Sequence, residues 1–175
     1  IGIMSIKMGI MQGRLSNSIN NTIQAFPEKS WVKEFELGQK INLNSIEWIF
    51  DSYIKNPIMN KQISEINNYI RKCQVKVNSI CADYFMINKL FNESEKNIKK
   101  NLEVLKELAI NGKKIGAKII EIPLVDSSSL KTEKNKKELV TNLKKVISEI
   151  NDLGLIITLE TDLPPKEFLN LLEMF

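Results

Sequence analysis

The chain has 175 residues, of which 43% are hydrophobic and 26% are charged, and its formal net charge is +4. This composition is typical of a soluble globular domain, and the absence of any apolar run of about 18 residues argues against a membrane partner. We therefore expect one domain over residues 1–175. The sequence contains no histidine, which removes the commonest general base and the commonest transition-metal ligand.

The basic residues are interleaved with acidic ones, as in the segment Lys131–Thr132–Glu133–Lys134. A nucleic-acid-binding protein would gather lysine and arginine on one face with aromatic residues between them, so we expect no nucleic-acid partner. The two cysteines, Cys73 and Cys81, form no CxxC pair, which argues against a zinc site. Reduced thiols in a cytoplasmic protein are the simplest expectation.

Short apolar runs alternate with longer amphipathic stretches along the whole chain. Each short run predicts a buried strand, and each longer stretch predicts a helix because its apolar residues recur at helical spacing. In chain order the sequence predicts a strand over 6–11, a helix from near Trp31 with Ser30 as its N-cap, a strand over 45–50, a helix over 60–72, a strand over 75–81, a helix over 94–111, a strand over 118–124, a helix over 132–152, a strand over 155–159 and a helix from near Lys166.

This βα alternation predicts an α/β fold with a parallel sheet. Eight such units take about 250 residues in a complete barrel. The sequence therefore predicts a (β/α)8 TIM barrel truncated after the fifth βα unit. The rival architecture is an open, doubly wound five-stranded sheet, which would normally carry a glycine-rich phosphate turn after its first strand. Gly13 alone does not make such a turn.

Ligands bind at the carboxyl ends of the strands in both architectures. Each predicted strand has a charged residue at or near that end. Burying one carboxylate without a partner costs several kcal/mol, so five charged strand ends around one rim predict a polar pocket. A single such residue would be explained by capping of the next helix or by pairing with a lysine. The polar residues at the five strand ends are Gln12 and Arg14, Glu47, Asp83, Glu121 and Glu160.

At these residues the chain resembles the xylose-isomerase-like TIM-barrel superfamily, the sugar phosphate isomerases and epimerases. The resemblance covers essentially the whole chain and depends on the order and spacing of several segments. The segments that carry it are MGIMQGRL at 8–15, IEWIFD at 46–51, SICADYFM at 79–86 and LIITLET at 155–161.

Members of this family bind a divalent metal ion on carboxylates and a histidine at the ends of the last four strands. The glutamate of the fifth strand is one ligand and also transfers a proton. The resemblance therefore implies that Glu160 is both a metal ligand and the catalytic residue, with Mn, Mg, Co or Zn as the metal. The other ligands would belong to later strands, so the ligand set of this chain is incomplete.

The expected reaction explains these residue types. Isomerising or epimerising a sugar removes a proton beside a carbonyl, and the resulting enediolate needs a cation to stabilise its charge. We therefore expect a metal-dependent sugar or sugar-phosphate isomerase or epimerase. Arg14 would clamp a phosphate or a hydroxyl with its planar fork, or would form a surface salt bridge. The expected substrate contacts are Gln12, Arg14, Glu47, Asp83 and Glu121.

Trp48 has two interpretations, as core packing between barrel and helices or as a hydrophobic platform under the sugar. Three other functions also fit the fold. A polyol dehydratase would use the same barrel and a similar metal. An apurinic-site endonuclease would need a histidine-rich metal cluster, which the sequence lacks. A non-catalytic partial barrel would act as a binding or assembly module, with its open edges pairing into a homodimer.

Overall fold

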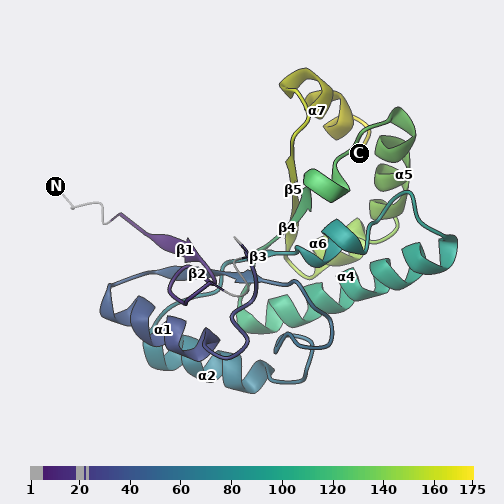
Figure 1. The fold of residues 1–175 in the computed structure, drawn as a ribbon. Helices are drawn as coiled ribbons and strands as arrows, with labels where there is room; N and C mark the ends of the chain where they lie inside the picture. Colours follow the sequence, from purple (N-terminus) through teal and green to yellow (C-terminus); the bar gives the residue numbers. More distant parts are fainter. Residues whose placement is uncertain (1–5, 19–21, 23) are drawn as a thin grey trace.

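The computed structural model describes residues 6–18, 22 and 24–175. The described residues form one parallel sheet in which the strands follow the order of the sequence, β1-β2-β3-β4-β5 (Figure 1). The strands are β1 (Gly9–Met11), β2 (Ser45–Ile49), β3 (Ser79–Cys81), β4 (Ile119–Leu124) and β5 (Ile156–Thr161).

The helices lie on one side of this curved sheet, and the opposite face is open (Figure 1). None of the helices in the described residues is long and apolar enough to cross a membrane. The helices are α1 (Trp31–Lys40), α2 (Ile63–Cys73), α3 (Tyr84–Ile87), α4 (Glu95–Ile115), α5 (Glu133–Leu143), α6 (Ile147–Asp152) and α7 (Pro165–Leu172), with a 3-10 turn η1 (Asp126–Ser128) after β4.

Strand alternation separates the two faces of the sheet. Ile46 and Trp48 of β2 and Ile120 of β4 are fully buried beneath the helices. Their neighbours Glu47 and Glu121 are only partly buried and lie on the open face. The sequential strand order with helices on one face confirms the TIM-barrel class, with five of its eight βα units. The doubly wound alternative is wrong, since that fold reverses its strand order and places helices on both faces.

Trp48 belongs to the core. It is fully buried, its ring lies 5.1 Å from that of Phe26 and 5.7 Å from that of Trp31, and its Nε1 donates to Asn56 Oδ1 at 2.9 Å. The platform interpretation is therefore wrong, because the indole faces the helices rather than the open face.

Several predicted boundaries differ from the structure. The first strand begins at Gly9 rather than at 6, and Ile6 is 85% exposed. The third strand begins at Ser79 rather than at 75, because Lys76 makes only an isolated bridge with Ser45. Residue 30 stands at the N-cap of α1, but its hydroxyl donates to Ser16 Oγ instead of capping the helix.

The predicted helix over 132–152 is divided into α5 and α6. The backbone N–H of Lys145 donates to the carbonyl of Asn142, and that of Val146 donates to the carbonyl of Leu143. Both hydrogen bonds span three residues instead of the four of an α-helix, so the regular helix is interrupted there. The side chain of Asn142 is buried and donates to the carbonyl of Leu90. This tertiary contact lies at the point where the regular helix stops.

Candidate functional site

The strand register places three glutamates on the open face of the sheet. Paired residues of parallel strands point to the same side, and Cys81 pairs with Glu121 while Pro123 pairs with Glu160. Ile49 pairs with Cys81, so Glu47 stands one row below Glu121. Glu160 stands one row above Glu121. Because successive rows on one face lie about 6.5 Å apart, the three carboxylates climb diagonally across the sheet instead of meeting at one point.

A cavity of about 550 Å³ lies at the carboxyl ends of the strands and is called the rim cavity here. It brings together residues from strand ends, the η1 turn and the β1–α1 loop. Of the predicted site residues, Asp83 and Glu160 line it, whereas Gln12, Arg14, Glu47 and Glu121 are not among its lining residues. Its polar lining residues are Gln24, Asp51, Asp83, Asn88, Asp126, Ser127 and Glu160.

Asp83 is the best-positioned carboxylate of the rim cavity. Gln24 Nε2 donates to both of its oxygens, at 3.0 and 2.8 Å, and Cys81 Sγ donates to one of them at 3.3 Å. Burial raises the pKa of Asp83, and these hydrogen bonds oppose the rise. The negative charges of Asp51 and Glu47 raise it further. Asp83 is therefore a hydrogen-bond acceptor in a fixed orientation, and its raised pKa makes it easier to protonate than an ordinary aspartate.

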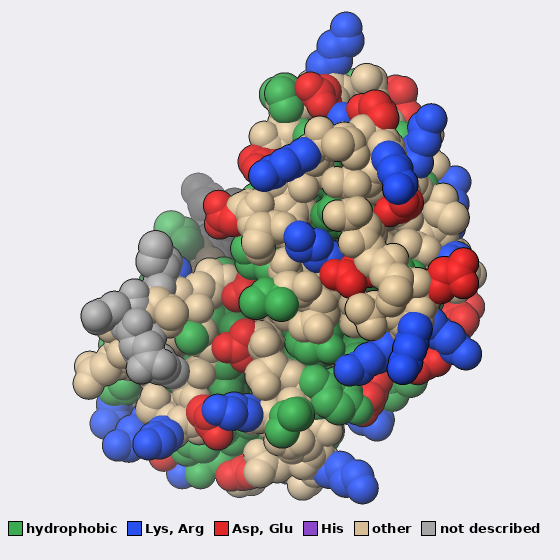
Figure 2. Space-filling view, turned by 45° about the vertical axis from the view of Figure 1, so that its right-hand side comes forward, with side chains coloured by type: hydrophobic (Ala, Val, Ile, Leu, Met, Phe, Trp, Pro, Cys, Tyr) green, Lys and Arg blue, Asp and Glu red, His purple; other side chains and the backbone are tan. Residues whose placement is uncertain are grey.

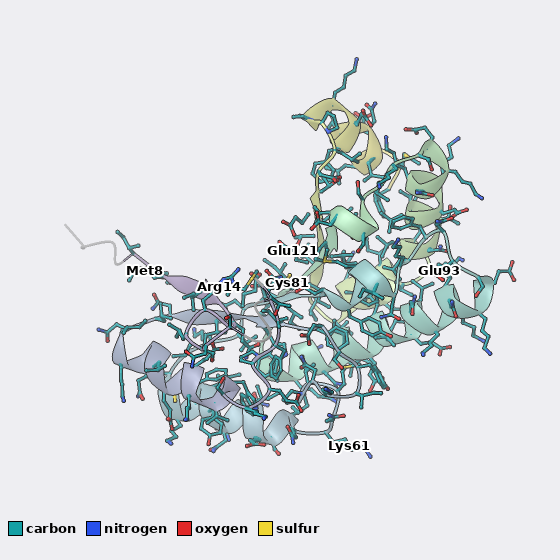
Figure 3. The ribbon with its side chains drawn as sticks, in the orientation of Figure 1. Met8, Arg14, Lys61, Cys81, Glu93 and Glu121 are labelled. Atoms are coloured by element: carbon teal, nitrogen blue, oxygen red, sulfur yellow. The ribbon has the colours of Figure 1, made fainter. Side chains whose placement is uncertain are left out.

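Glu121 and Cys81 stand side by side on the open face (Figure 3). Burial is the largest cause that raises the pKa of Glu121, followed by the charges of Glu47 and Glu160. Burial also raises the pKa of the Cys81 thiol strongly, and nearby carboxylates add to this. A thiol in acidic surroundings stays protonated, which disfavours Cys81 as a nucleophile.

Gln12 extends the pairing of β1 with β2. It is only 1% exposed, its backbone N–H donates to the carbonyl of Glu47 at 2.9 Å, and its Oε1 accepts from the N–H of Ile49 at 3.1 Å. Its Nε2 has no hydrogen-bond partner. The side chain thus ties two strands together and carries one donor that a ligand or a water could satisfy.

Arg14 lies in the loop that follows β1. It lines a separate hollow of about 250 Å³ with Ser16 and Pro27. The preceding Gly13 has a φ of 85°, a left-handed conformation that suits glycine. Arg14 therefore lines this smaller hollow in the β1–α1 loop and does not line the rim cavity.

Several residues in and around the site were not predicted as site residues, and Glu34 and Gln24 are the two that position others. Glu34 of α1 is 1% exposed, and its carboxylate accepts from the N–H groups of Gly13 and Leu15, which fixes the loop that carries Arg14. Gln24 orients Asp83 from the same loop. No local pattern marks either residue, because an acid on a helix and an amide in a loop are ordinarily solvated.

Basic and acidic side chains are interspersed on the face shown in Figure 2. The ion pairs among the described residues join lysines to glutamates on helices and include none of the open-face carboxylates. The open face therefore presents acidic groups that these ion pairs do not neutralise. The expectation of no nucleic-acid partner stays a prediction.

The described residues do not assemble a metal centre. No group of three or more histidine, cysteine, aspartate or glutamate side chains within the described ranges is placed to hold a metal ion. The register separates Glu47 from Glu160 by two rows along the sheet. Glu160 alone is positioned at the end of β5, where the resemblance implies a ligand.

No protein-family profile and no curated protein sequence matches the chain. Solved structures do match its fold. The 3-keto-D-glucoside 4-epimerase YcjR from E. coli has 15% identity and a TM-score of 0.62, and the match covers 89% of this chain and 56% of that one. A xylose isomerase-like TIM barrel protein from Mycobacterium smegmatis, solved with magnesium, has 11% identity and a TM-score of 0.66 over 95% of this chain and 60% of that one.

The IOLI protein with a bound zinc atom has 22% identity and a TM-score of 0.61, over 88% of this chain and 51% of that one. The chain therefore has the fold of the xylose isomerase-like TIM barrel proteins. It spans between 51% and 60% of the length of these three solved chains. At these identities the likeness establishes the fold alone.

Proposed function

We propose that this chain is part of a metal-dependent sugar or sugar-phosphate isomerase or epimerase in which Glu160 transfers the proton. The observation that carries the proposal is the position of Glu160. It stands exposed near the carboxyl end of β5 and lines the rim cavity together with Asp51 and Asp83. The chain shares its fold with a solved sugar epimerase, which supports the general isomerase or epimerase class.

The proposed chemistry begins with the carboxylate of Glu160 removing a proton from the carbon beside the sugar carbonyl. Returning the proton to the carbonyl carbon, while the hydroxyl proton passes to the former carbonyl oxygen, isomerises the sugar. Delivery of a proton from solvent to the opposite face of the original carbon epimerises it. Asp83, held by Gln24, accepts hydrogen bonds from sugar hydroxyls. Glu121 and Glu47 are proposed as further acceptors lower on the open face.

Gln12 and Arg14 complete the proposed set of substrate contacts. The unpartnered Nε2 of Gln12 supports this role, because a buried donor without an acceptor is costly. Arg14 would have to reach the substrate from the β1 side. A cytoplasmic location is also proposed, since Cys73 and Cys81 are both free and buried.

A divalent metal ion, Mn, Mg, Co or Zn, belongs to the proposal because two structural neighbours were solved with zinc and magnesium. The described residues do not assemble its site, so ligands other than Glu160 would have to come from elsewhere. The roles proposed for this chain are therefore limited to proton transfer and substrate contact.

Solvent exchange tests the proposal directly. Aldoses and ketoses are incubated with the protein as encoded, in D2O with each of the four metals, and exchange of the C–H proton is followed by NMR. We expect exchange that falls by about 10²–10⁴-fold in Glu160→Gln, the usual worth of a general base. Asp162→Asn is the matched control, because Asp162 accepts from Ser129 Oγ and does not line the cavity.

Absence of exchange with every sugar, or equal exchange in Glu160→Gln, would contradict the proposal. Reading the coding sequence downstream of Phe175 gives an independent test. Three further βα units with Asp, His and Glu at their strand ends would support the enzyme. A stop codon immediately after Phe175 would favour a non-catalytic module.

One observation favours that second candidate, an assembly module. Within the described part of the chain, β1 and β5 each pair with only one strand, and Ile156 of β5 is 61% exposed. Beside β5 lies a hollow of about 420 Å³ with a mainly apolar lining that includes Leu143, Ile157, Leu159, Phe168 and Leu172. Exposed strand edges with apolar surface pair readily, so this candidate predicts a homodimer.

Sedimentation velocity over a range of concentrations tests the homodimer. The candidate requires concentration-dependent association that Ile156→Lys abolishes. Ile110→Lys, on an exposed position of α4, is the matched control. A monomer at every concentration would exclude the assembly module.

A further inference from the structure

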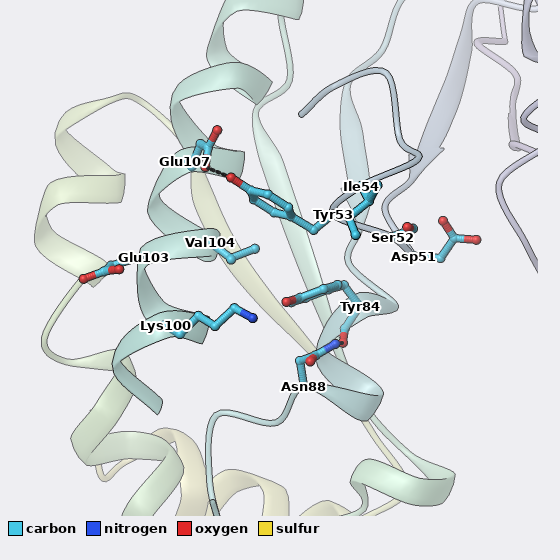
Figure 4. A pocket seen from close by; sticks show the side chains of 10 residues that line it. All are labelled: Asp51, Ser52, Tyr53, Ile54, Tyr84, Asn88, Lys100, Glu103, Val104 and Glu107. Carbon is cyan, nitrogen blue, oxygen red and sulfur yellow. Dashed lines mark hydrogen bonds between the residues drawn. The ribbon is translucent and has the colours of Figure 1, made fainter. Parts of the chain in front are cut away.

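A second cavity, of about 540 Å³, lies beside the rim cavity and is called the side cavity here (Figure 4). The loop after β2 forms one wall, through residues 51–54. Tyr84 of α3 and Asn88, which follows α3, form the floor. Residues of α4 from Lys100 to Glu107 form the far wall. The side cavity thus lies outside the sheet, between two βα units.

The side cavity and the rim cavity are adjacent. Asp51, Tyr84 and Asn88 line both of them. A molecule that spanned both cavities would have to pass beside these three residues. Two hollows of about 550 and 540 Å³ that share a wall offer room for a substrate larger than one sugar ring.

Two polar side chains of the side cavity, Tyr84 and Lys100, form no hydrogen bond or ion pair with another described side chain. Tyr84 is only 8% exposed, yet its hydroxyl forms no hydrogen bond with a described residue, and burial alone raises its pKa. The ammonium group of Lys100 joins none of the ion pairs of the described residues. Figure 4 shows both groups pointing into the hollow. Among the described residues only Gln12 Nε2 is a buried side-chain polar atom without a partner, so the Tyr84 hydroxyl is open to the hollow and available to a bound molecule or to water.

The lining combines aromatic faces with both donors and acceptors. The rings of Tyr53 and Tyr84 lie on opposite sides of the hollow (Figure 4). Tyr53 is fixed because its hydroxyl donates to Glu107 Oε2 at 3.0 Å. A sugar ring would present its apolar C–H faces to such rings and its hydroxyls to Lys100. Three carboxylates against one lysine disfavour a phosphate or another anion here.

We propose that the side cavity binds the second sugar unit of a glycoside whose reacting unit occupies the rim cavity. The substrate class is then a disaccharide or other glycoside rather than a free monosaccharide. This inference rests on the proposed function for the reacting unit. Lys100 and Tyr53 determine the specificity for the longer substrate and take no part in the chemistry.

Binding measurements test the inference without turnover. Affinities for glucose and fructose are compared with those for cellobiose, maltose, trehalose and sucrose by titration of the intact protein. We expect at least one disaccharide to bind about tenfold more tightly than glucose, as one additional well-made contact allows. Lys100→Met and Tyr53→Ala should remove that advantage and leave the affinity for glucose unchanged. Lys99→Met, an exposed neighbour on α4 outside the cavity, is the control.

Equal affinity for glucose and every disaccharide overturns the inference, and so does an equal loss of glucose and disaccharide binding in both variants. Both variants replace exposed side chains, and thermal unfolding confirms that they fold. The inference and the proposed function fail separately. If no proton exchange is found, the proposed function fails, but the ratio of disaccharide to glucose affinity can still exceed one. If that ratio is one, the inference fails, but proton exchange that depends on Glu160 can still be observed.

Discussion

Glu34 shows how one buried side chain determines the shape of the site. Its carboxylate accepts from the N–H of Gly13 at 2.9 Å and from that of Leu15 at 3.1 Å. Glu34→Ala leaves both donors without an acceptor in a partly buried loop. We expect the free energy of unfolding to fall by about 1–3 kcal/mol, measured by urea denaturation.

Glu36 provides the control on the same helix. Its carboxylate meets only Lys72, at 3.5 Å, and both side chains are largely exposed. Surface pairs of this kind contribute about 1 kcal/mol or less, so Glu36→Ala should have a small effect. Equal effects of the two substitutions would show that the loop does not depend on Glu34.

Glu121 gives the open face a pH dependence of unusual sign. Burial and the charges of Glu47 and Glu160 raise the pKa of Glu121 above its ordinary value of 4.5. A carboxyl group whose pKa is higher in the folded state than in the unfolded state stabilises the fold when the pH is below its unfolded-state pKa. This stability is lost as the pH rises through the raised pKa, so the ionised Glu121 opposes folding at neutral pH.

Glu121→Gln should therefore stabilise the protein at pH 7. We expect Tm to rise by about 1–3 °C, since about 1 kcal/mol corresponds to 2–4 °C for a chain of this size. The gain should shrink toward zero at pH 4, where the wild-type carboxyl is protonated. Glu173→Gln, an exposed acid near the end of α7, should show no such pH-dependent gain in the same melting curves.

At the scale of the elements, the sequence predicts the order of strands and helices well and their ends less well. Runs such as 45–50 and 118–124 predict strands because apolar burial under helices is a local pattern. The division of the helix at 144–146 depends on the contact of Asn142 with the carbonyl of Leu90. The short helix α3 was also missed. Neither feature has a local signal, because each depends on packing between distant segments.

Two buried glycines in helices predict opposite effects of the same substitution. A Cβ at Gly112 of α4 would lie 2.8 Å from Ile80 Cδ1, so the helix packs directly on β3. A Cβ at Gly38 of α1 would meet Val75 Cγ2 at 3.5 Å, an ordinary contact. Alanine stabilises a helix by about 0.5–1 kcal/mol relative to glycine, whereas overpacking a core costs about 1–3 kcal/mol.

Gly38→Ala should therefore raise the free energy of unfolding by about 0.5–1 kcal/mol. Gly112→Ala should lower it by up to about 2 kcal/mol, since Ile80 is fully buried and must shift. Urea denaturation of the two variants in parallel measures both signs. A gain at both positions would mean that the contact between α4 and β3 is looser than the structure indicates.

At the scale of the molecule, the sequence predicts that acidic residues stand at strand ends, but not how they are arranged. Asp83 and Glu160 both line the rim cavity, and their roles as site residues stay predictions. The register places Glu47 and Glu121 on lower rows of the same face. Register follows from pairing between strands, so the diagonal arrangement could not be derived from the strands one at a time.

The open face of the sheet increases the accessible surface of the molecule. The accessible surface is 10437 Å², whereas a folded monomer of this mass is expected to expose about 8,700 Å². An uncovered sheet face and two free strand edges contribute to this difference. Even so, the buried apolar residues form one cluster that extends from Trp48 through Ile80 and Leu105 to Leu143.

This continuous core predicts that residues 1–175 unfold as one domain. Both tryptophans, Trp31 and Trp48, lie in the first two βα units, so fluorescence reports on that end of the sheet. Far-UV circular dichroism reports on the helices of the whole chain, including α4 and α5. Because the core joins the two ends, both signals should give the same urea midpoint, as two-state unfolding requires. Separate midpoints would show that β4, β5 and their helices unfold independently of the tryptophan-containing end.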